Sequence, residues 1–245
     1  MKLKVLSFNI HKGFNWNNTV PTLDKLKTFL IRENPDIVFL QEVVGENEIF
    51  SKKFSHWMSN QLEFLADSIW TEHAYAKNAI YDGRHHGNVI LSKYPILNQK
   101  QVNISTNKYE QRGVLHCEID VQGKMIHCYN VHLNLTHSGR KKQYQSLKKI
   151  ILESNTQDDP VILAGDFNDW NKRACNSLVD DLQLIEAYKG MHADYAKTFP
   201  AIYPLFPLDR IYTKHFKVTA ADVPNCILAK NLSDHLPISM ECELL

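Results

Sequence analysis

Short apolar runs separated by a helical segment constrain the fold of this 245-residue chain more than any other feature. Val5 to Ile10 is rich in strand-forming residues, and leucines at helical spacing follow between Pro21 and Asn34. The proline after Asn34 stops a helix there, and Asp36 to Leu40 forms the next apolar run. The chain therefore opens with a predicted strand, helix and strand.

The rest of the sequence repeats this alternation in a looser form. One segment, Ser138 to Glu153, carries a single apolar stripe surrounded by lysine and arginine, which predicts a surface helix. Many strands with interspersed helices indicate an α/β or α+β layered sandwich. No internal repeat or Gly/Ser linker divides the chain, so we expect one domain over residues 1–245. Further strand-like runs occur at Val89 to Leu91, Val114 to Ile119, Met125 to Val131 and Val161 to Ala164.

Composition narrows the classes of partner and compartment. Lys and Arg number 28 against 27 Asp and Glu, and this net charge of +1 gives no general attraction to long nucleic acids, although a local basic groove stays open. No window approaches the roughly 18 apolar residues of a membrane span, and the first residues do not read as a secretion signal. The five cysteines are an odd number without CxxC spacing and lie in or beside apolar runs. We therefore expect a cytoplasmic monomer with reduced, buried thiols and no transmembrane segment.

Polar side chains recur where the predicted strands end. Side chains at the ends of neighbouring strands converge on one edge of a sheet, where open α/β architectures bind ligands. Their oxygen atoms suit a hard cation, and their imidazoles suit acid–base chemistry or stabilisation of a transition state. These positions are Asn9, Glu42, His132, Asn134, Asp166 and Asn168, to which the last third of the chain adds Asp209, Asp234 and His235.

Seven short motifs in a fixed order give these positions a family resemblance. They are SFNI, QE, GNVILS, NVHL, GDFND, LDRIY and SDHLP, and they extend from Ser7 to Pro237. In this order and spacing they resemble the endonuclease/exonuclease/phosphatase superfamily. The resemblance implies a four-layer α/β/β/α sandwich, with two mixed β-sheets packed face to face, helices outside and the site at one end. It also implies hydrolysis of phosphate esters with a divalent cation.

The resemblance assigns a metal role to three residues. Glu42 corresponds to the principal metal carboxylate, Asn9 supports the metal or a neighbouring water, and Asp234 is a further carboxylate on the metal side. Mg²⁺ fits these oxygen ligands because it keeps several waters and takes only one or two protein carboxylates, and Mn²⁺ is the alternative.

Five further residues receive catalytic roles from the resemblance. Asp166 positions or deprotonates the attacking water, and Asn168 holds the phosphate or that water in line. His235, held by Asp209, presents an imidazole to the phosphoryl oxygens, and His132 is a second phosphate-facing histidine. A carboxylate bonded to one ring nitrogen fixes the tautomer of such a histidine and favours its charged form.

Five further polar residues are the expected substrate contacts. Arg112 and Arg140 fall where small bacterial members of the superfamily place polar residues near the pocket, and the motif from Arg84 to Asn88, with His86 and Asn88, resembles the same members. Asn134, at a strand end beside His132, completes the set. His11 stands where abasic-site endonucleases often have an acidic residue, and its role stays open with those of His85 and His86.

Structural interpretations compete with several of these assignments. Asp234-His235 and the GDFND segment also suit turns, because Asp and Asn bond to nearby backbone groups. His85 and His86 also suit a solvent-facing loop, Asp209 suits pairing with a structural arginine, and His132 suits a core position. The apolar segment from Phe199 to Phe206 predicts either a pocket for an apolar leaving group or ordinary packing.

Three hypotheses of function follow. The first is a Mg²⁺-dependent hydrolase of a small phosphodiester or phosphomonoester, such as a lipid headgroup, a nucleotide or a sugar phosphate, and the balanced charge favours it. The second is a metal-dependent DNA or RNA nuclease, which requires a positive groove leading to His235 and activity that falls steeply with salt. The third is a non-catalytic module that binds a phosphate ligand on the same fold.

Overall fold

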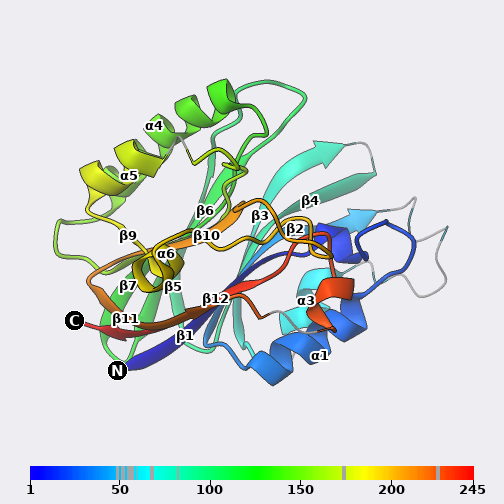
Figure 1. Cartoon of the computed structure of the whole chain (residues 1–245), viewed down its shortest axis with the longest axis horizontal. Coiled ribbons are helices and arrows are strands. Elements are labelled where there is room, and N and C mark those ends of the chain that lie inside the picture. Colours follow the sequence, from blue (N-terminus) through cyan, green and yellow to red (C-terminus); the bar gives the residue numbers. More distant parts are fainter. Residues whose placement is uncertain are drawn as a thin grey trace.

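Two β-sheets pack face to face in the protein, and helices cover their outer faces (Figure 1). The computed structural model describes residues 1–47, 50, 53, 58, 60–66, 69–81, 83–172, 175–224 and 227–245. Within these residues each sheet has six strands and contains both parallel and antiparallel pairs. The predicted four-layer α/β/β/α sandwich is therefore confirmed.

The first sheet contains both ends of the described chain. Its central strands β1 and β2 are parallel, as the predicted strand–helix–strand opening requires, and the other neighbours are antiparallel. The strand order is β11 (Phe216–Asp222), β12 (Ile238–Leu244), β1 (Lys2–Asn9), β2 (Ile37–Asn47), β4 (Arg84–Ser92) and β3 (Glu72–Tyr81).

The second sheet is built from the middle of the chain. Its parallel pair is β7 and β8, and its other neighbours are antiparallel. The strand order is β5 (Ile96–Asn103), β6 (Gly113–Val121), β7 (Lys124–His132), β8 (Val161–Asp166), β10 (Asp209–Lys214) and β9 (Ile185–Glu186).

Helices cover each sheet from its own side (Figure 1). Helix α1 (Leu23–Glu33) and helix α3 (Gln61–Ala66) pack on the first sheet, whereas α4 (His137–Ser154) and α5 (Cys175–Leu182) pack on the second. Helix α1 ends at Glu33, next to the Asn-Pro pair that predicts its end, and Asn34 caps it in a left-handed conformation. A short helix, α6 (Ala187–His192), lies beside β10 and β11. The remaining turns include two 3₁₀ helices, η1 (His11–Gly13) and η2 (Ala229–Asn231).

Among the described residues, no helix is both long and apolar enough to cross a membrane.

The central strands are apolar on both faces because each face meets another layer. Val5 and Phe39 point into the core between the sheets, while Phe8 and Leu40 point toward α1. A strand buried on both faces reads as a continuous apolar run, which is why these two strands are recognisable in the sequence. Three cysteines of the predicted set, at positions 117, 128 and 242, are buried and free. The side chain at position 175 and all of position 226 lie outside the described part.

A buried polar contact joins the two sheets close to the end that carries the site. Asn130 of β7 donates to the carbonyl oxygens of Leu40 (2.9 Å) and Val89 (2.7 Å), and its own amide oxygen accepts from Gln41 (2.8 Å). Asn88 of β4 donates to the carbonyl oxygen of Asn130 at 3.2 Å. Buried amides are costly unless bonded, so these contacts favour one register between the sheets.

Candidate active site

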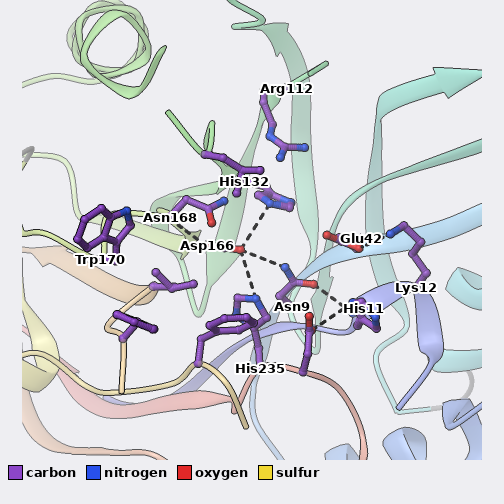
Figure 2. Close-up of a pocket in the computed structure, with 15 residues that line it drawn as sticks. Asn9, His11, Lys12, Glu42, Arg112, His132, Asp166, Asn168, Trp170 and His235 are labelled. Carbon is purple, nitrogen blue, oxygen red and sulfur yellow. Dashed lines mark hydrogen bonds and ion pairs between the residues drawn. The ribbon is translucent and has the colours of Figure 1, made fainter. Parts of the chain in front are cut away.

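A cavity of about 640 Å³ opens at the end of the sandwich where strands of both sheets stop. Its polar side chains come from β1, β2, β7 and β8, from η1, and from the segments that precede β6, follow β8 and precede β12 (Figure 2). The cavity brings together segments that are more than 200 residues apart in the chain, as the predicted convergence of strand ends requires. Its walls are Asn9, His11, Lys12, Glu42, Arg112, His132, Leu135, Asp166, Asn168, Trp170, Phe199, Phe206, Leu208, Asp234 and His235.

Asp166 lies at the centre of this cavity and contacts four predicted site residues (Figure 2). Its Oδ2 accepts a hydrogen bond from Asn9 Nδ2 at 3.1 Å and lies 3.5 Å from His132 Nε2 and 3.8 Å from His235 Nε2. Its Oδ1 accepts from the backbone N–H of Asn168 at 2.9 Å. One carboxylate thus connects residues from both sheets.

The backbone beside Asp166 is shaped by Gly165. This residue has φ of +142°, and a Cβ there would lie 1.9 Å from the carbonyl oxygen of Val131 on the neighbouring strand. Only glycine allows β8 to approach β7 this closely. The approach sets Asp166 directly opposite His132 in the strand register.

Asp209 and His235 form the predicted dyad. Asp209 Oδ2 is 2.8 Å from His235 Nδ1, and both side chains are buried. Burial alone would lower the pKa of His235, but Asp209 and then Asp166 outweigh it and raise that pKa to about 10. His235 is therefore an imidazolium at neutral pH, with Nε2–H directed to the cavity side near Asp166.

Asp166 and His132, which lie next to His235 in the cavity, have pKa values that are shifted in opposite directions. Burial raises the pKa of Asp166 to about 7, and the nearby Asp209 adds to the rise while His235 opposes it. Burial and the positive charge of Arg112 hold the pKa of His132 well below its usual range. The site thus combines one cationic and one neutral imidazole around a carboxylate that can exchange a proton near neutral pH.

Glu42 reaches the cavity through an irregularity in β2. The register of β2 against β4 shifts between Leu40 and Val43, and Glu42 adopts a left-handed φ of 59°. Such a conformation is strained for a non-glycine residue and is commonly retained at functional sites. Its Oε2 lies 3.0 Å from Lys12 Nζ. Burial acts to raise the pKa of Glu42, but Lys12 and the nearby histidines prevail, so this pKa is depressed and the carboxylate is ionised.

A chain of polar contacts holds Asp234 in place at the wall of the cavity. Asn9 Oδ1 accepts from the backbone N–H of His11 at 3.1 Å, and His11 Nδ1 lies 3.2 Å from Asp234 Oδ1. Ser233 Oγ donates to the carbonyl oxygen of Asn9 at 2.7 Å and accepts from the backbone N–H of His235 at 3.2 Å. His11 thus holds Asp234 at the wall, and Ser233 ties β1 to the segment that carries His235.

The donor set fits a hard divalent cation better than a softer one. Glu42, Asn9 and Asp234 offer carboxylate or amide oxygens on one side of the cavity, which is the chemistry that Mg²⁺ or Mn²⁺ prefers. Asp166, Asp209 and His235 also have ligand-type atoms within 4.8 Å of one another. A protonated imidazole has no lone pair for a metal, so this second trio acts better as a hydrogen-bonding unit.

Three predicted substrate contacts do not reach the cavity wall. The Asn134 amide is fully buried against Thr106 Oγ1 (2.7 Å) and Gln143 Nε2 (2.7 Å). Arg140 is equally buried and donates to the carbonyl oxygens of Asn134 and Leu135. Asn88 belongs to the contact between the sheets described above. These three side chains bond to neighbouring side chains or to the backbone, and none of them lines the cavity.

The other two predicted contacts remain accessible. Arg112 lines the cavity, donating from Nε to the carbonyl oxygen of Leu133 (3.2 Å) and from Nη2 to Glu110 Oε1 (3.1 Å). His86 lines an adjoining cavity of about 630 Å³ together with His85, and burial lowers the pKa of His86 to about 4. The two cavities share Glu42 and Arg112, so this histidine pair lies beside the Glu42 side of the active-site cavity.

Sequence reasoning did not identify the roles of Lys12, Ser233 and Trp170. Lys12 pairs with Glu42 on one side of the cavity, and Trp170 forms part of the apolar wall on the other side. The adjacency of Ser233 to Asp234 and that of Trp170 to GDFND are signals in the sequence, because neighbours of a site residue share its location. Lys12 follows His11 directly, but its pairing with Glu42 joins residues 30 positions apart, which adjacency in the sequence does not predict.

The fold and this constellation define the class of protein. The model of the Endonuclease/Exonuclease/phosphatase family matches residues 6–235, and the chain belongs to that family. Among curated proteins it is similar to uncharacterized protein YbhP of Escherichia coli strain K12, with 40% identity over 244 residues that cover 98% of this chain and 96% of YbhP.

Solved structures share the fold at low sequence identity. An endonuclease/exonuclease/phosphatase from Beutenbergia cavernae superposes with a TM-score of 0.82 at 21% identity, covering 99% of this chain and 72% of that one. The mannosyl-6-phosphatase Bt3783 of Bacteroides thetaiotaomicron superposes with a TM-score of 0.75 at 17% identity, covering 99% and 100%. At these identities the likeness establishes the fold alone.

Proposed function

We propose that this protein is a Mg²⁺- or Mn²⁺-dependent hydrolase of phosphate esters that acts by in-line attack of an activated water. The observation that carries the proposal is the arrangement around Asp166, whose Oδ2 lies within 4 Å of a cationic and of a neutral imidazole. Phosphoryl transfer needs positioning and neutralisation of charge more than covalent help from the protein. The cavity offers both.

The reaction divides the work among four side chains. Asp166 accepts a proton from the attacking water, for which its pKa of about 7 is suited, and Asn168 keeps that water in line with the phosphorus. As the new oxygen–phosphorus bond forms and the bond to the leaving oxygen breaks, the leaving alkoxide takes a proton from solvent water and departs as the alcohol. His235 keeps its own proton throughout, and its Nε2–H donates a hydrogen bond to a phosphoryl oxygen. Asp209 keeps His235 oriented and charged.

A divalent cation completes the balance of charge. It supplies positive charge to a phosphoryl oxygen when bound, and Glu42 with Asn9 is the pair best placed to hold it, with Asp234 nearby. The depressed pKa of Glu42 keeps that carboxylate ionised at any physiological pH.

The walls of the cavity favour a small or amphiphilic substrate. Trp170 lies on the side of Asp166 opposite to Glu42 and Lys12 (Figure 2), and Phe199, Phe206, Leu208 and Leu135 line the cavity with it. The side chains of Trp170 and Leu135 are 55% and 66% exposed. An exposed apolar wall of this kind is unfavourable in water unless an apolar group of a ligand covers it. An apolar alcohol or acyl portion of the ester would cover this wall. Lys12 is paired with Glu42 and Arg112 with Glu110, so the charges here suit a small ester better than a polyanion.

Nuclease activity is the second candidate. It is favoured by the adjoining cavity, which extends the site past Arg112 and is lined by Arg84, His85 and His86. An extended basic groove would engage several phosphates at once, and its occupancy would fall steeply with salt. A small ester has one or two charges, so its hydrolysis would depend only weakly on salt.

An assay of the purified protein against a panel of esters tests these candidates. DNA, RNA, phospholipids, nucleotides and sugar phosphates are incubated side by side with Mg²⁺ or Mn²⁺, at low and at high salt. We expect turnover of a small or lipid phosphate ester with little dependence on salt. Dominant, salt-sensitive cleavage of DNA or RNA would support the nuclease, and tight binding without any hydrolysis would support a binding module.

Substitution of the wall tests the preference for an apolar group. Trp170→Ala removes the largest exposed apolar side chain of the cavity, so we expect KM for an ester of a long-chain alcohol to rise about tenfold. KM for a sugar phosphate should stay unchanged. Trp16→Ala, which changes a tryptophan of similar exposure outside the cavity, is the matched control. Equal effects of Trp170→Ala on both esters would remove the argument for an apolar subsite.

A further inference from the structure

Two histidines and two acidic residues gather on the outer face of the second sheet, away from the cavity. On β6 and β7 the residues Cys117 and Cys128 point into the core between the sheets. Because side chains alternate along a strand, His116, Glu118 and His127 point to the opposite face, where α4 packs. Glu118 is directly opposite His127 in the antiparallel register, and His116 is the diagonal neighbour of His127 across the same pair of strands.

The distances in this cluster are those of a ligand set. His116 Nε2 lies 3.0 Å from His127 Nδ1, and each of His116, Glu118 and His127 offers a ligand atom within 4.8 Å of the other two. Metal–nitrogen bonds of 2.0–2.1 Å at a tetrahedral angle place two ligand nitrogens about 3.3 Å apart. The two imidazoles would therefore need to separate by only a few tenths of an ångström to bind one ion.

The surroundings hold both rings in place. His116 stacks on Tyr129 with ring centroids 4.3 Å apart, and His127 stacks on His116 at 5.3 Å. His127 Nε2 lies 3.8 Å from Asp159 Oδ2, in the loop between α4 and β8. A histidine that binds a metal with one nitrogen usually directs the other N–H to a carboxylate, and Asp159 is placed for this role.

The protonation of the cluster agrees with this geometry. Burial, the neighbouring His127 and Lys100 lower the pKa of His116 to about 4, and burial lowers the pKa of His127. Both rings are thus neutral at pH 7. With an ion between them, His116 carries its proton on Nδ1 and His127 carries its proton on Nε2, facing Asp159. One of the two rings therefore changes tautomer when the ion binds, and binding needs no net loss of a proton.

From this juxtaposition we propose a second metal site at His116, His127 and Glu118, with Asp159 as the partner of His127, that takes a borderline divalent ion such as Zn²⁺. Imidazole nitrogen selects Zn²⁺, Co²⁺, Ni²⁺ or Cu²⁺ over Mg²⁺, whereas the oxygen-rich cavity prefers Mg²⁺. The two sites therefore differ in the metal that they select.

The position of the cluster gives the ion a structural role. His127 precedes His132 by five residues on β7, which corresponds to roughly 16 Å along a strand, and the two side chains face opposite sides of the sheet. The ion joins the β6–β7 hairpin and, through Asp159, the loop after α4. An ion that binds only the folded state raises the melting temperature with its concentration.

Titration of the metal-stripped protein with Co²⁺ alone and with Zn²⁺ alone tests the proposal. Visible absorption reports nitrogen-ligated Co²⁺, and calorimetry reports the number of Zn²⁺ equivalents. Glu42→Gln serves as the background, which weakens the cavity as a competing site. His116→Gln and His127→Gln should each remove one equivalent and its Co²⁺ spectrum, whereas His73→Gln, at an exposed histidine of β3, should change neither.

Asp159→Asn covers the case in which a buried histidine variant fails to fold, because Asp159 is on the surface. It should weaken Zn²⁺ binding about 10- to 100-fold and reduce the rise in melting temperature with Zn²⁺. The proposal is overturned if His116→Gln or His127→Gln binds as many equivalents as His73→Gln with the same affinity. It is equally overturned if folded Asp159→Asn binds Zn²⁺ as tightly as the parent.

Discussion

Asp209 acts on the proposed reaction only through His235, so the two residues should be distinguishable by experiment. His235→Ala removes the cationic donor, and we expect turnover of a phosphate ester to fall about a hundredfold or more. Asp209→Asn leaves the ring in place but removes the charge that raises its pKa, so turnover should fall less, about 10- to 100-fold.

The pH–rate profile separates a positioning role from loss of structure. In the wild type, the alkaline limb should report loss of the His235 proton, whose pKa is about 10. In Asp209→Asn this limb should move to lower pH, and Asp194→Asn, at an exposed carboxylate, should leave it unchanged. An unshifted alkaline limb in Asp209→Asn would contradict the dyad.

For single residues, the sequence predicts which ones lie near the site but not which groups each side chain contacts. The cavity contains Asn9, Glu42, Asp166 and His235, all named from motifs at strand ends. Asn88 lies within the GNVILS motif, Asn134 directly follows NVHL and Arg140 lies in the helix after it, yet all three bond to the interior. A polar side chain in or near a motif can turn toward the cavity or the interior, and only the packing around it decides the direction.

At the scale of elements, the strands recognisable in sequence are those with apolar partners on both faces. β1, β2 and β8 are buried along nearly their whole length, and their apolar runs match the structure. β5 is an edge strand with the polar sequence ILNQKQVN and is almost fully exposed. β5 forms because β6 offers backbone hydrogen-bond partners to it. Backbone pairing does not require apolar side chains, so the sequence of β5 does not indicate a strand.

The pairing of β7 with β8 should depend on Gly165. Gly165→Ala places a methyl group against the carbonyl oxygen of Val131, so we expect the free energy of unfolding to fall by more than about 2 kcal/mol. Gly123→Ala is the matched control, since Gly123 also has a positive φ of +84° but has open space around the added carbon. Urea unfolding measures both variants. Equal losses would show that backbone strain alone, and not the close approach of β7, requires glycine.

The first turn of α6 should make stability depend on pH. Burial raises the pKa of Glu186, which caps this helix, from 4.5 to about 7. Because the folded pKa exceeds the unfolded one, the favourable contribution is complete below pH 4.5 and is lost as the pH rises through 7. Glu186→Gln should therefore reduce the loss of unfolding free energy between pH 4.5 and 8, and Glu153→Gln, at an exposed helical glutamate, should not. Identical pH dependence in Glu186→Gln and wild type would contradict this assignment.

At the scale of the whole molecule, the site exists only where the two sheets meet. Asn9 and Glu42 belong to the first sheet, while His132, Asp166 and Asp209 belong to the second. The contact between Asn9 and Asp166 spans the two sheets. The order of the motifs along the chain predicted this assembly through the family resemblance, whereas periodicity alone predicted only a layered fold. Which strands pair depends on residues that are far apart in the chain, as the pairing of β1 with β12 shows. How the two sheets face each other depends on contacts such as that of Asn9 with Asp166.

Hydrolysis of bis-p-nitrophenyl phosphate by the metal-stripped protein is the most direct test of the proposed chemistry. We expect no turnover in EDTA, recovery on addition of Mg²⁺ or Mn²⁺, and a loss of about a hundredfold or more in Glu42→Gln and in His235→Ala. Both variants should keep the circular dichroism spectrum of the wild type. Turnover that persists in EDTA, or that survives in both folded variants, would contradict a metal-dependent site built around Asp166.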